Sequence, residues 1–123
     1  MARILIVEDE QEVKGLFEEW LKSAGHQVIV AADGREAMAR LSESAADLIL
    51  TDLYMPNQDG VETIMQVRKL FPNLPIIAMS GNPQAGSMLG VAEKLGVVGS
   101  LQKPFAFADL SSLVDKALKG GKG

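Results

Sequence analysis

Residues 4–9 read Ile-Leu-Ile-Val-Glu-Asp, an apolar run of strand length that passes directly into two acids. Four more apolar runs of strand length follow along the chain. The five runs are Ile4 to Val7, Gln27 to Ala31, Leu48 to Leu50, Ile76 to Met79 and Val97 to Leu101. Segments with helical spacing separate them, and this alternation with short connections predicts right-handed βαβ units. The expected fold is therefore α/β, with a parallel five-stranded sheet covered by helices on both faces.

The clearest helix lies between the first two runs. Its apolar face consists of Val13, Leu16, Phe17, Trp20, Leu21 and Ala24. Gly25 follows at the position of a left-handed C-cap. The other helices are expected over Arg35 to Ser42, Val61 to Phe71, Met88 to Leu95 and about Asp109 to Leu118. The fourth of these five helices contains glycines, each of which destabilises a helix by about 1 kcal/mol relative to alanine, so we expect it to be mobile.

Length and composition exclude several classes of protein. The 123 residues fit one domain, which we expect to span residues 1–119. We expect a flexible, glycine-rich tail at residues 120–123. The formal net charge of −4 argues against direct binding of nucleic acid, because phosphate contacts need clustered Lys and Arg. Cysteine is absent, and no apolar run is long enough to cross a membrane or to act as a targeting signal. We expect a cytoplasmic protein with no membrane partner.

Polar residues follow four of the five apolar runs. Glu8 and Asp9 follow the first, Asp52 the third, Ser80 the fourth and Lys103 the fifth. In open parallel α/β sheets, ligands bind outside the carboxyl ends of the strands, so these side chains should converge at one edge.

Three carboxylates brought together repel one another, and a hard cation removes that conflict. Mg²⁺ takes oxygen ligands and commonly combines one or two carboxylates with phosphate oxygens, so Glu8, Asp9 and Asp52 could supply a Mg²⁺ site that Mn²⁺ can also occupy. One carboxylate could then attack phosphorus and form an aspartyl-phosphate, while Lys103 holds another phosphoryl oxygen. The residues predict Mg²⁺-dependent phosphoryl transfer.

These motifs, taken together, resemble the response regulator receiver domain of two-component signalling over essentially the whole chain. Glu8-Asp9 is similar to the acidic pair of that family, and Asp52 in Thr-Asp-Leu-Tyr-Met-Pro to its phosphoacceptor. Ser80 in Met-Ser-Gly-Asn resembles its hydroxyl switch, and Lys103-Pro104-Phe105 its lysine motif. Asp59-Gly60 also falls where the family places it.

The resemblance implies a flavodoxin-like (βα)₅ fold, doubly wound, with strand order 2-1-3-4-5. It implies that a histidine kinase or a histidine phosphotransfer domain donates the phosphoryl group, and that the output reaches a downstream protein target. The backbone carbonyl of Tyr54 would complete the metal site, and Tyr54 and Asn82 would border the path of the hydrolytic water. Such a protein dephosphorylates itself slowly and is not a conventional turnover enzyme. Three alternatives stay open for this chain: a stand-alone regulator, a phosphorelay intermediate, or a part of a longer protein.

Two positions depart from the family pattern. Ser100 stands where many members carry an aromatic residue that turns inward on activation. We therefore expect phosphorylation to reorder residues 81–95 more than it repacks residues 97–102. Ala106 stands where members often carry a helix-capping Asp, so we expect the last helix to begin at Asp109.

Two other classes of protein compete with this interpretation. A phosphatase of the haloacid dehalogenase type also uses an Asp nucleophile and Mg²⁺, but its motif needs a second acid where this chain has Tyr54. A flavodoxin-like binding module would share the fold, but no glycine-rich phosphate loop follows the first apolar run. Flavin absorbance of the purified protein would identify the second alternative.

Overall fold

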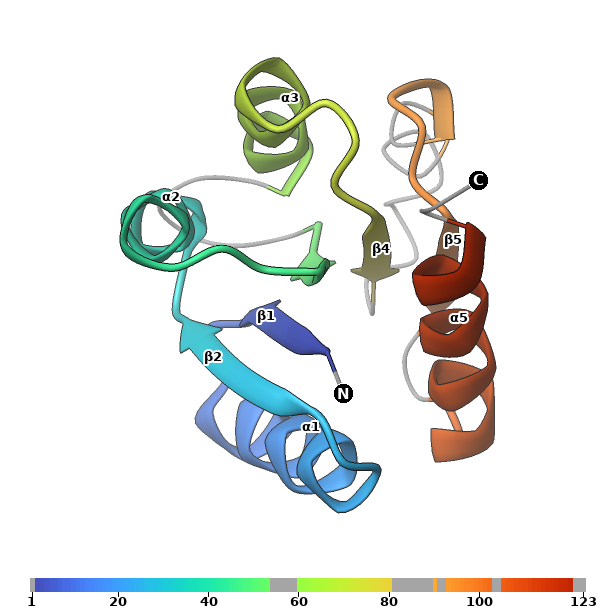
Figure 1. The fold of residues 1–123 in the computed structure, drawn as a ribbon. Coiled ribbons are helices and arrows are strands. Elements are labelled where there is room, and N and C mark those ends of the chain that lie inside the picture. Colours follow the sequence, from blue (N-terminus) through green and yellow to red (C-terminus); the bar gives the residue numbers. More distant parts are fainter. Residues whose placement is uncertain (1, 54–59, 81–89, 91–92, 103–104, 121–123) are drawn as a thin grey trace.

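The structure is a computed structural model that describes residues 2–53, 60–80, 90, 93–102 and 105–120 (Figure 1). Five strands and four helices lie in this part of the chain. They are β1 (Arg3–Val7), α1 (Gln11–Ser23), β2 (Gln27–Ala31), α2 (Gly34–Glu43), β3 (Leu48–Asp52), α3 (Gly60–Leu70), β4 (Ile76–Ser80), β5 (Gly99–Gln102) and α5 (Phe107–Gly120). The strands pair in the order β2-β1-β3-β4-β5, and all four pairings are parallel. The doubly wound sheet with strand order 2-1-3-4-5 is therefore confirmed.

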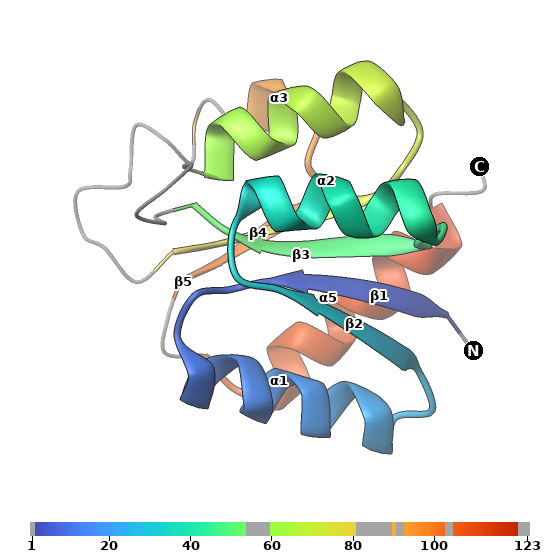
Figure 2. The same cartoon turned by 90° about the vertical axis from the view of Figure 1, so that its left-hand side faces the viewer.

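The sheet lies between two layers of helices, with α2 and α3 on one face and α1 and α5 on the other (Figure 2). Strand side chains alternate between the two faces, as the period of two in a strand requires. On the α1 and α5 side the buried strand residues are Ile4, Ile6, Leu48, Leu50, Ile77, Met79 and Leu101. On the α2 and α3 side they are Leu5, Val7, Ala31, Ile49, Ile76 and Ala78. We call the end of the sheet where the strands finish the carboxyl edge, and the other end the amino edge.

Helix α1 closes as its sequence predicts. Gly25 has a φ of +95°, and its N–H donates to the carbonyl of Lys22 at 3.0 Å. The apolar face is confirmed for Phe17 and Leu21, which are buried, but it is wrong for Leu16, which is 45% exposed. Leu16 lies at the outer margin of the helical stripe, where the elements that the structure describes leave it partly uncovered.

Four aromatic rings join α1 to the segment before and at the start of α5. Phe17 stacks on Phe105 with ring centroids 5.5 Å apart, and Trp20 packs on Phe107 at 5.2 Å. The prediction that α5 begins at Asp109 is wrong, because the helix already begins at Phe107. The carbonyl of Ala106 accepts the N–H of Asp109 at 3.0 Å, so the first turn forms without a side-chain cap.

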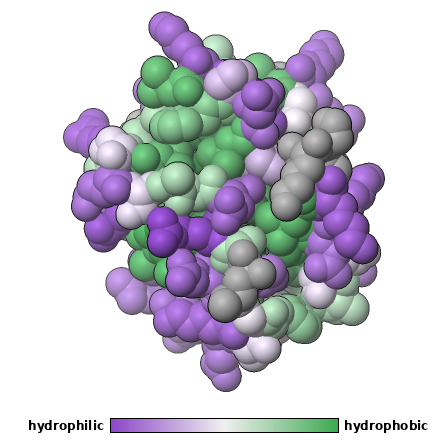
Figure 3. Space-filling model, viewed as in Figure 1, coloured by the Kyte–Doolittle hydropathy of each residue, from purple (hydrophilic) through white to green (hydrophobic). Residues whose placement is uncertain are grey.

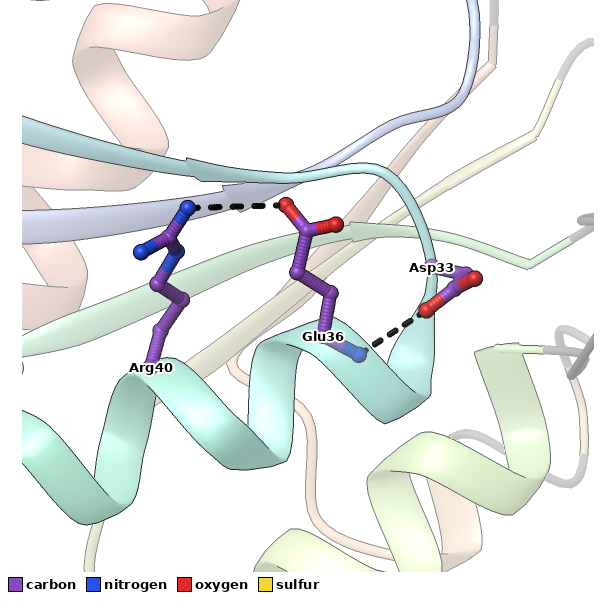
Figure 4. A network of polar contacts seen from close by, with 3 residues as sticks. All are labelled: Asp33, Glu36 and Arg40. Atoms are coloured by element: carbon purple, nitrogen blue, oxygen red, sulfur yellow. Dashed lines mark hydrogen bonds and ion pairs between the residues drawn. The ribbon is translucent and has the colours of Figure 1, made fainter.

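Helix α2 carries the side-chain cap that α1 lacks. Asp33 Oδ1 accepts the N–H of Glu36 at 2.8 Å, which satisfies one of the donors left open at a helix N-terminus (Figure 4). One turn further on, Glu36 and Arg40 form an ion pair at 3.8 Å on the exposed side of the helix. At α1 the N-cap residue is Glu10, which makes no such side-chain bond.

The expected fourth helix lies mostly outside the described residues. Gly90, Glu93 and Lys94 are helical, and residues 95–96 form a turn before β5. Among the helices that the structure describes, none is both long and apolar enough to cross a membrane.

Candidate functional site

Strand β3 carries Asp52 to the carboxyl edge of the sheet. Every residue of β3 is buried, and Asp52 is its last residue, with only 5% of its surface exposed. The Thr51 hydroxyl donates to the carbonyl of Asp52 at 3.0 Å. The N–H of Leu53 donates to the carbonyl of Met79 at 2.9 Å, so the backbone stays bound to β4 beyond Asp52. Hydrogen bonds thus hold the backbone on both sides of Asp52, from which the carboxylate projects.

Gly60, the first residue of α3, packs directly against the backbone of Asp52. Its N–H donates to the carbonyl of Leu53 at 2.9 Å. A Cβ atom at this position would fall on the carbonyl oxygen of Asp52 and lie 2.5 Å from the Cα of Leu53. Only glycine allows this approach. The sequence pattern named Gly60 by resemblance alone, and its steric role appears only in the fold.

Strand β1 supplies the other two carboxylates. The N–H of Glu8 donates to the carbonyl of Ala31 at 3.0 Å, which continues the pairing with β2 past the end of β1. The Glu8 side chain is fully buried, and its Oε2 accepts the N–H of Glu10 at 3.2 Å. Asp9 is exposed. One of the two acids therefore points into the protein and the other toward solvent.

Glu8, Asp9 and Asp52 come together as the sequence predicts. One carboxylate oxygen from each lies within 4.8 Å of the others. Three like charges at this spacing repel one another, most strongly where two of them are buried, and a bound cation would offset the repulsion. The donors are all carboxylate oxygens and one of them faces water, which suits a hard cation that keeps part of its hydration shell. The three residues fit a divalent metal ion.

Ser80 ends strand β4 at the same edge. Its side chain is buried, with 1% exposed, and it pairs in register with Gln102 of β5. Asp52 pairs with Met79, so Ser80 stands one residue further along the neighbouring strand. Lys103 directly follows Gln102 in the sequence, but Lys103, Tyr54 and Asn82 lie outside the described residues. Sequence reasoning gave no role to Thr51, whose hydroxyl binds the backbone carbonyl of Asp52; a hydroxyl residue at the end of an apolar run, just before Asp52, was the available signal.

Two hollows on the surface lie away from the carboxylates. One of about 410 Å³ is apolar and lies at the ends of α2 and α3 near the amino edge, where Figure 3 shows apolar surface. Its lining residues are Leu41, Ala45, Ala46, Leu70, Phe71, Pro72, Asn73 and Leu74. The other, of about 490 Å³, lies between α2 and α3 and includes Arg35 and Lys69. Neither contains a carboxylate of the candidate site.

Comparison with known proteins identifies the class. The family model of the response regulator receiver domain matches residues 4–115, so the chain belongs to the receiver domain family. The transcriptional regulatory protein CpxR of Klebsiella pneumoniae is 33% identical over 119 residues, which are 97% of this chain and 50% of CpxR. The chain spans half or less of the length of the curated relatives it matches. This membership favours the receiver interpretation over the phosphatase and flavodoxin-like alternatives.

Solved structures agree with the family. The chemotaxis protein CheY4 of Vibrio cholerae is 30% identical and superposes with a TM-score of 0.89 over 96% of this chain and 99% of CheY4. The response regulator TrrA of Thermotoga maritima, solved in complex with Mg²⁺-BeF, is also 30% identical and has a TM-score of 0.86, with 96% of this chain and all of TrrA covered.

Proposed function

We propose that this receiver domain accepts a phosphoryl group on Asp52 in a reaction that depends on Mg²⁺. The observation that carries the proposal is the cluster of Glu8, Asp9 and Asp52 at the carboxyl edge of a receiver fold, with their oxygens within 4.8 Å. Asp52 is the best placed nucleophile of the three, because it ends a fully buried strand and hydrogen bonds hold the backbone on both sides of it.

Glu8, Asp9 and Asp52 would hold the metal ion, and the backbone carbonyl of Tyr54 would join them by analogy with the family. When bound, Mg²⁺ supplies charge neutralisation for the carboxylates and for the phosphoryl oxygens, and Mn²⁺ can take its place. The structure of TrrA with Mg²⁺-BeF supports this assignment, because that relative binds the ion together with a phosphoryl mimic.

In the transfer step, an Asp52 carboxylate oxygen attacks the phosphorus of a phosphohistidine. A new O–P bond forms, the N–P bond breaks, and the electron pair of that bond returns to the imidazole of the donor. Lys103 binds a phosphoryl oxygen and the Ser80 hydroxyl donates a hydrogen bond to another. Water later cleaves the acyl phosphate slowly, so the domain acts as a switch and not as a turnover enzyme.

We propose a histidine kinase or a histidine phosphotransfer domain as the donor, and a protein as the receiver of the output. The family belongs to two-component signalling, and relatives such as CpxR are transcriptional regulators. The receiver unit is proposed to span residues 1–119, in the cytoplasm, with no direct contact to nucleic acid or membrane.

Acetyl phosphate tests the proposal without knowledge of the natural donor. Intact-protein mass spectrometry should show one added phosphoryl group in the presence of Mg²⁺ and none after chelation. Asp52→Asn should abolish the addition, whereas Asp115→Asn, an exposed acid of α5, should leave it unchanged. The same gain in mass in the Asp52→Asn variant would contradict the assignment.

A further inference from the structure

The side chain of Arg68 on α3 binds four backbone carbonyls at the amino edge. Its Nε donates to Leu95 at 2.8 Å, and its Nη2 donates to Gly96 at 2.9 Å. Its Nη1 donates to Leu74 at 2.6 Å and more weakly to Pro72 at 3.4 Å. All three nitrogens of the guanidinium are therefore bound to carbonyl oxygens.

These carbonyls belong to two segments that are distant in sequence. Pro72 and Leu74 lie in the connection that enters β4, and Leu95 and Gly96 lie in the turn that precedes β5. The two segments meet again directly, because the N–H of Val98 donates to the carbonyl of Ile76 at 2.8 Å. Arg68 thus ties together the chain just before β4 and the chain just before β5.

The chemistry of this contact favours a fixed arrangement. Arg68 is half-buried, and burial lowers the pKa of its guanidinium from the ordinary value, but the group stays charged at any physiological pH. Carbonyl dipoles at the end of a helical turn point their negative ends at the cation. A lysine has a single nitrogen and cannot reach four acceptors that are spread over the planar fork of an arginine.

The opposite ends of the same two strands carry the switch. Strand β4 ends at Ser80, and β5 ends at Gln102, next to Lys103 in the sequence. Both strands are short, so a displacement of Ser80 toward a phosphoryl group would also shift the amino ends of the strands unless contacts at the amino edge hold them.

We propose that Arg68 is the positioning residue that keeps the amino ends of β4 and β5 in place while the carboxyl ends respond to phosphorylation. This inference rests on the proposed function, since it concerns how the state of Asp52 is transmitted. It sets a limit to the response: residues near Ser80 change, and residues 95–98 do not. Within residues 81–95, where reordering is expected, the change should therefore stop before Leu95, which Arg68 holds.

Hydrogen exchange followed by mass spectrometry tests this positioning role of Arg68, which we call the Arg68 anchor. Exchange is measured in Mg²⁺ alone and in Mg²⁺ with beryllofluoride. In the unchanged protein, residues 95–98 should exchange at the same rate in both conditions, within about two-fold, while residues 78–80 respond. In Arg68→Met, residues 95–98 should exchange at least ten-fold faster, and beryllofluoride should now change their rate. Arg68→Lys should not restore the original behaviour. Lys69→Met, which alters the exposed neighbour on the same helix, serves as the control.

A purely structural role would raise exchange equally in both conditions, and in β1 and β3 as well as in residues 95–98. That result, or equal exchange at 95–98 in the unchanged protein and in Arg68→Met, would overturn the anchor. If Arg68→Met does not fold, the unchanged protein decides alone, because a response at 95–98 as large as that at 78–80 contradicts the proposal. Failure of the unchanged protein to take a phosphoryl group would instead overturn the proposed function, and the exchange rates without beryllofluoride would still test the anchor.

Discussion

The carboxyl edge of the sheet gathers three groups of the same charge, whereas the amino edge surrounds one cation with dipoles of the opposite sign. Glu8, Asp9 and Asp52 bring their oxygens within 4.8 Å, and two of these side chains are buried. Arg68 faces four carbonyl oxygens at 2.6–3.4 Å. In the proposed function the first arrangement would gain free energy from a bound cation, whereas in the second the chain itself supplies the groups that bind the charge.

This difference separates the part of the molecule that can respond from the part that stays fixed. A cluster of like charges changes its free energy when an ion or a phosphoryl group binds, so it can drive a conformational change. An arginine already bound to carbonyls has little to gain from a ligand. Four changes test this contrast, from the largest expected effect to the smallest.

Gly60→Ala should be the most damaging single change at the carboxyl edge. The new methyl group meets backbone of Asp52 and Leu53, which cannot move without displacing β3, so we expect a loss of about 3 kcal/mol or more in the free energy of unfolding. Urea denaturation measures it. Gly15→Ala is the matched control, because nothing lies within 4 Å of its Cβ, and it should stabilise α1 by up to about 1 kcal/mol. Equal effects at the two glycines would show that α3 does not press on Asp52.

Arg68→Met should destabilise the amino edge by about 2 kcal/mol, because it leaves several partly buried carbonyls without their charged donor. The effect is smaller than for a fully buried group, since water can reach part of this region. Lys69→Met should stay within about 0.5 kcal/mol, as is usual for exposed positions. If Arg68→Met loses no more stability than Lys69→Met, the contacts of Arg68 do not stabilise the amino edge, and the contrast between the two edges fails.

Asp52→Asn should raise the free energy of unfolding, not lower it, in a buffer without divalent cations. Repulsion between charges within 4.8 Å at an effective dielectric constant near 20 is about 3 kcal/mol, and the loss of the other interactions of the carboxylate offsets part of the relief, so we expect a gain of about 1.5 kcal/mol. Thermal unfolding without Mg²⁺ measures the effect of the repulsion. Unfolding with Mg²⁺ measures the effect of metal binding, since Mg²⁺ should stabilise the unchanged protein and not the variant. Asp9→Asn should also weaken Mg²⁺ binding clearly in calorimetry. Destabilisation by Asp52→Asn without Mg²⁺ would mean that the other interactions of the Asp52 carboxylate outweigh its repulsion from Glu8 and Asp9.

The smallest effect concerns two helix N-termini at the carboxyl edge. Asp33→Ala removes the side-chain bond to the N–H of Glu36 and should cost about 1 kcal/mol of stability. Glu10→Ala should cost less than about 0.5 kcal/mol, because Glu10 makes no side-chain cap at α1. Chemical denaturation of the two variants side by side decides the matter, and a larger cost at Glu10 would show that α1 depends on this residue in a way its cap geometry does not explain.

Local patterns in the sequence determined most of the framework of this protein. The five apolar runs, the C-cap at Gly25 and the acids after the first and third runs each depend on neighbours within a few residues. The order of the strands came from the family resemblance, and the structure confirms it. Periodicity and turn chemistry act over one or two turns of chain, which is why they can be recognised without the fold.

Only the tertiary structure decided which contacts cross the fold. It buries Glu8 and exposes Asp9, although the two are adjacent. It begins α5 at Phe107, where packing on Trp20 outweighs the missing cap. It brings Arg68 to carbonyls 27 and 28 residues away. Burial and packing depend on which distant segments meet, and no local pattern in these residues specifies that.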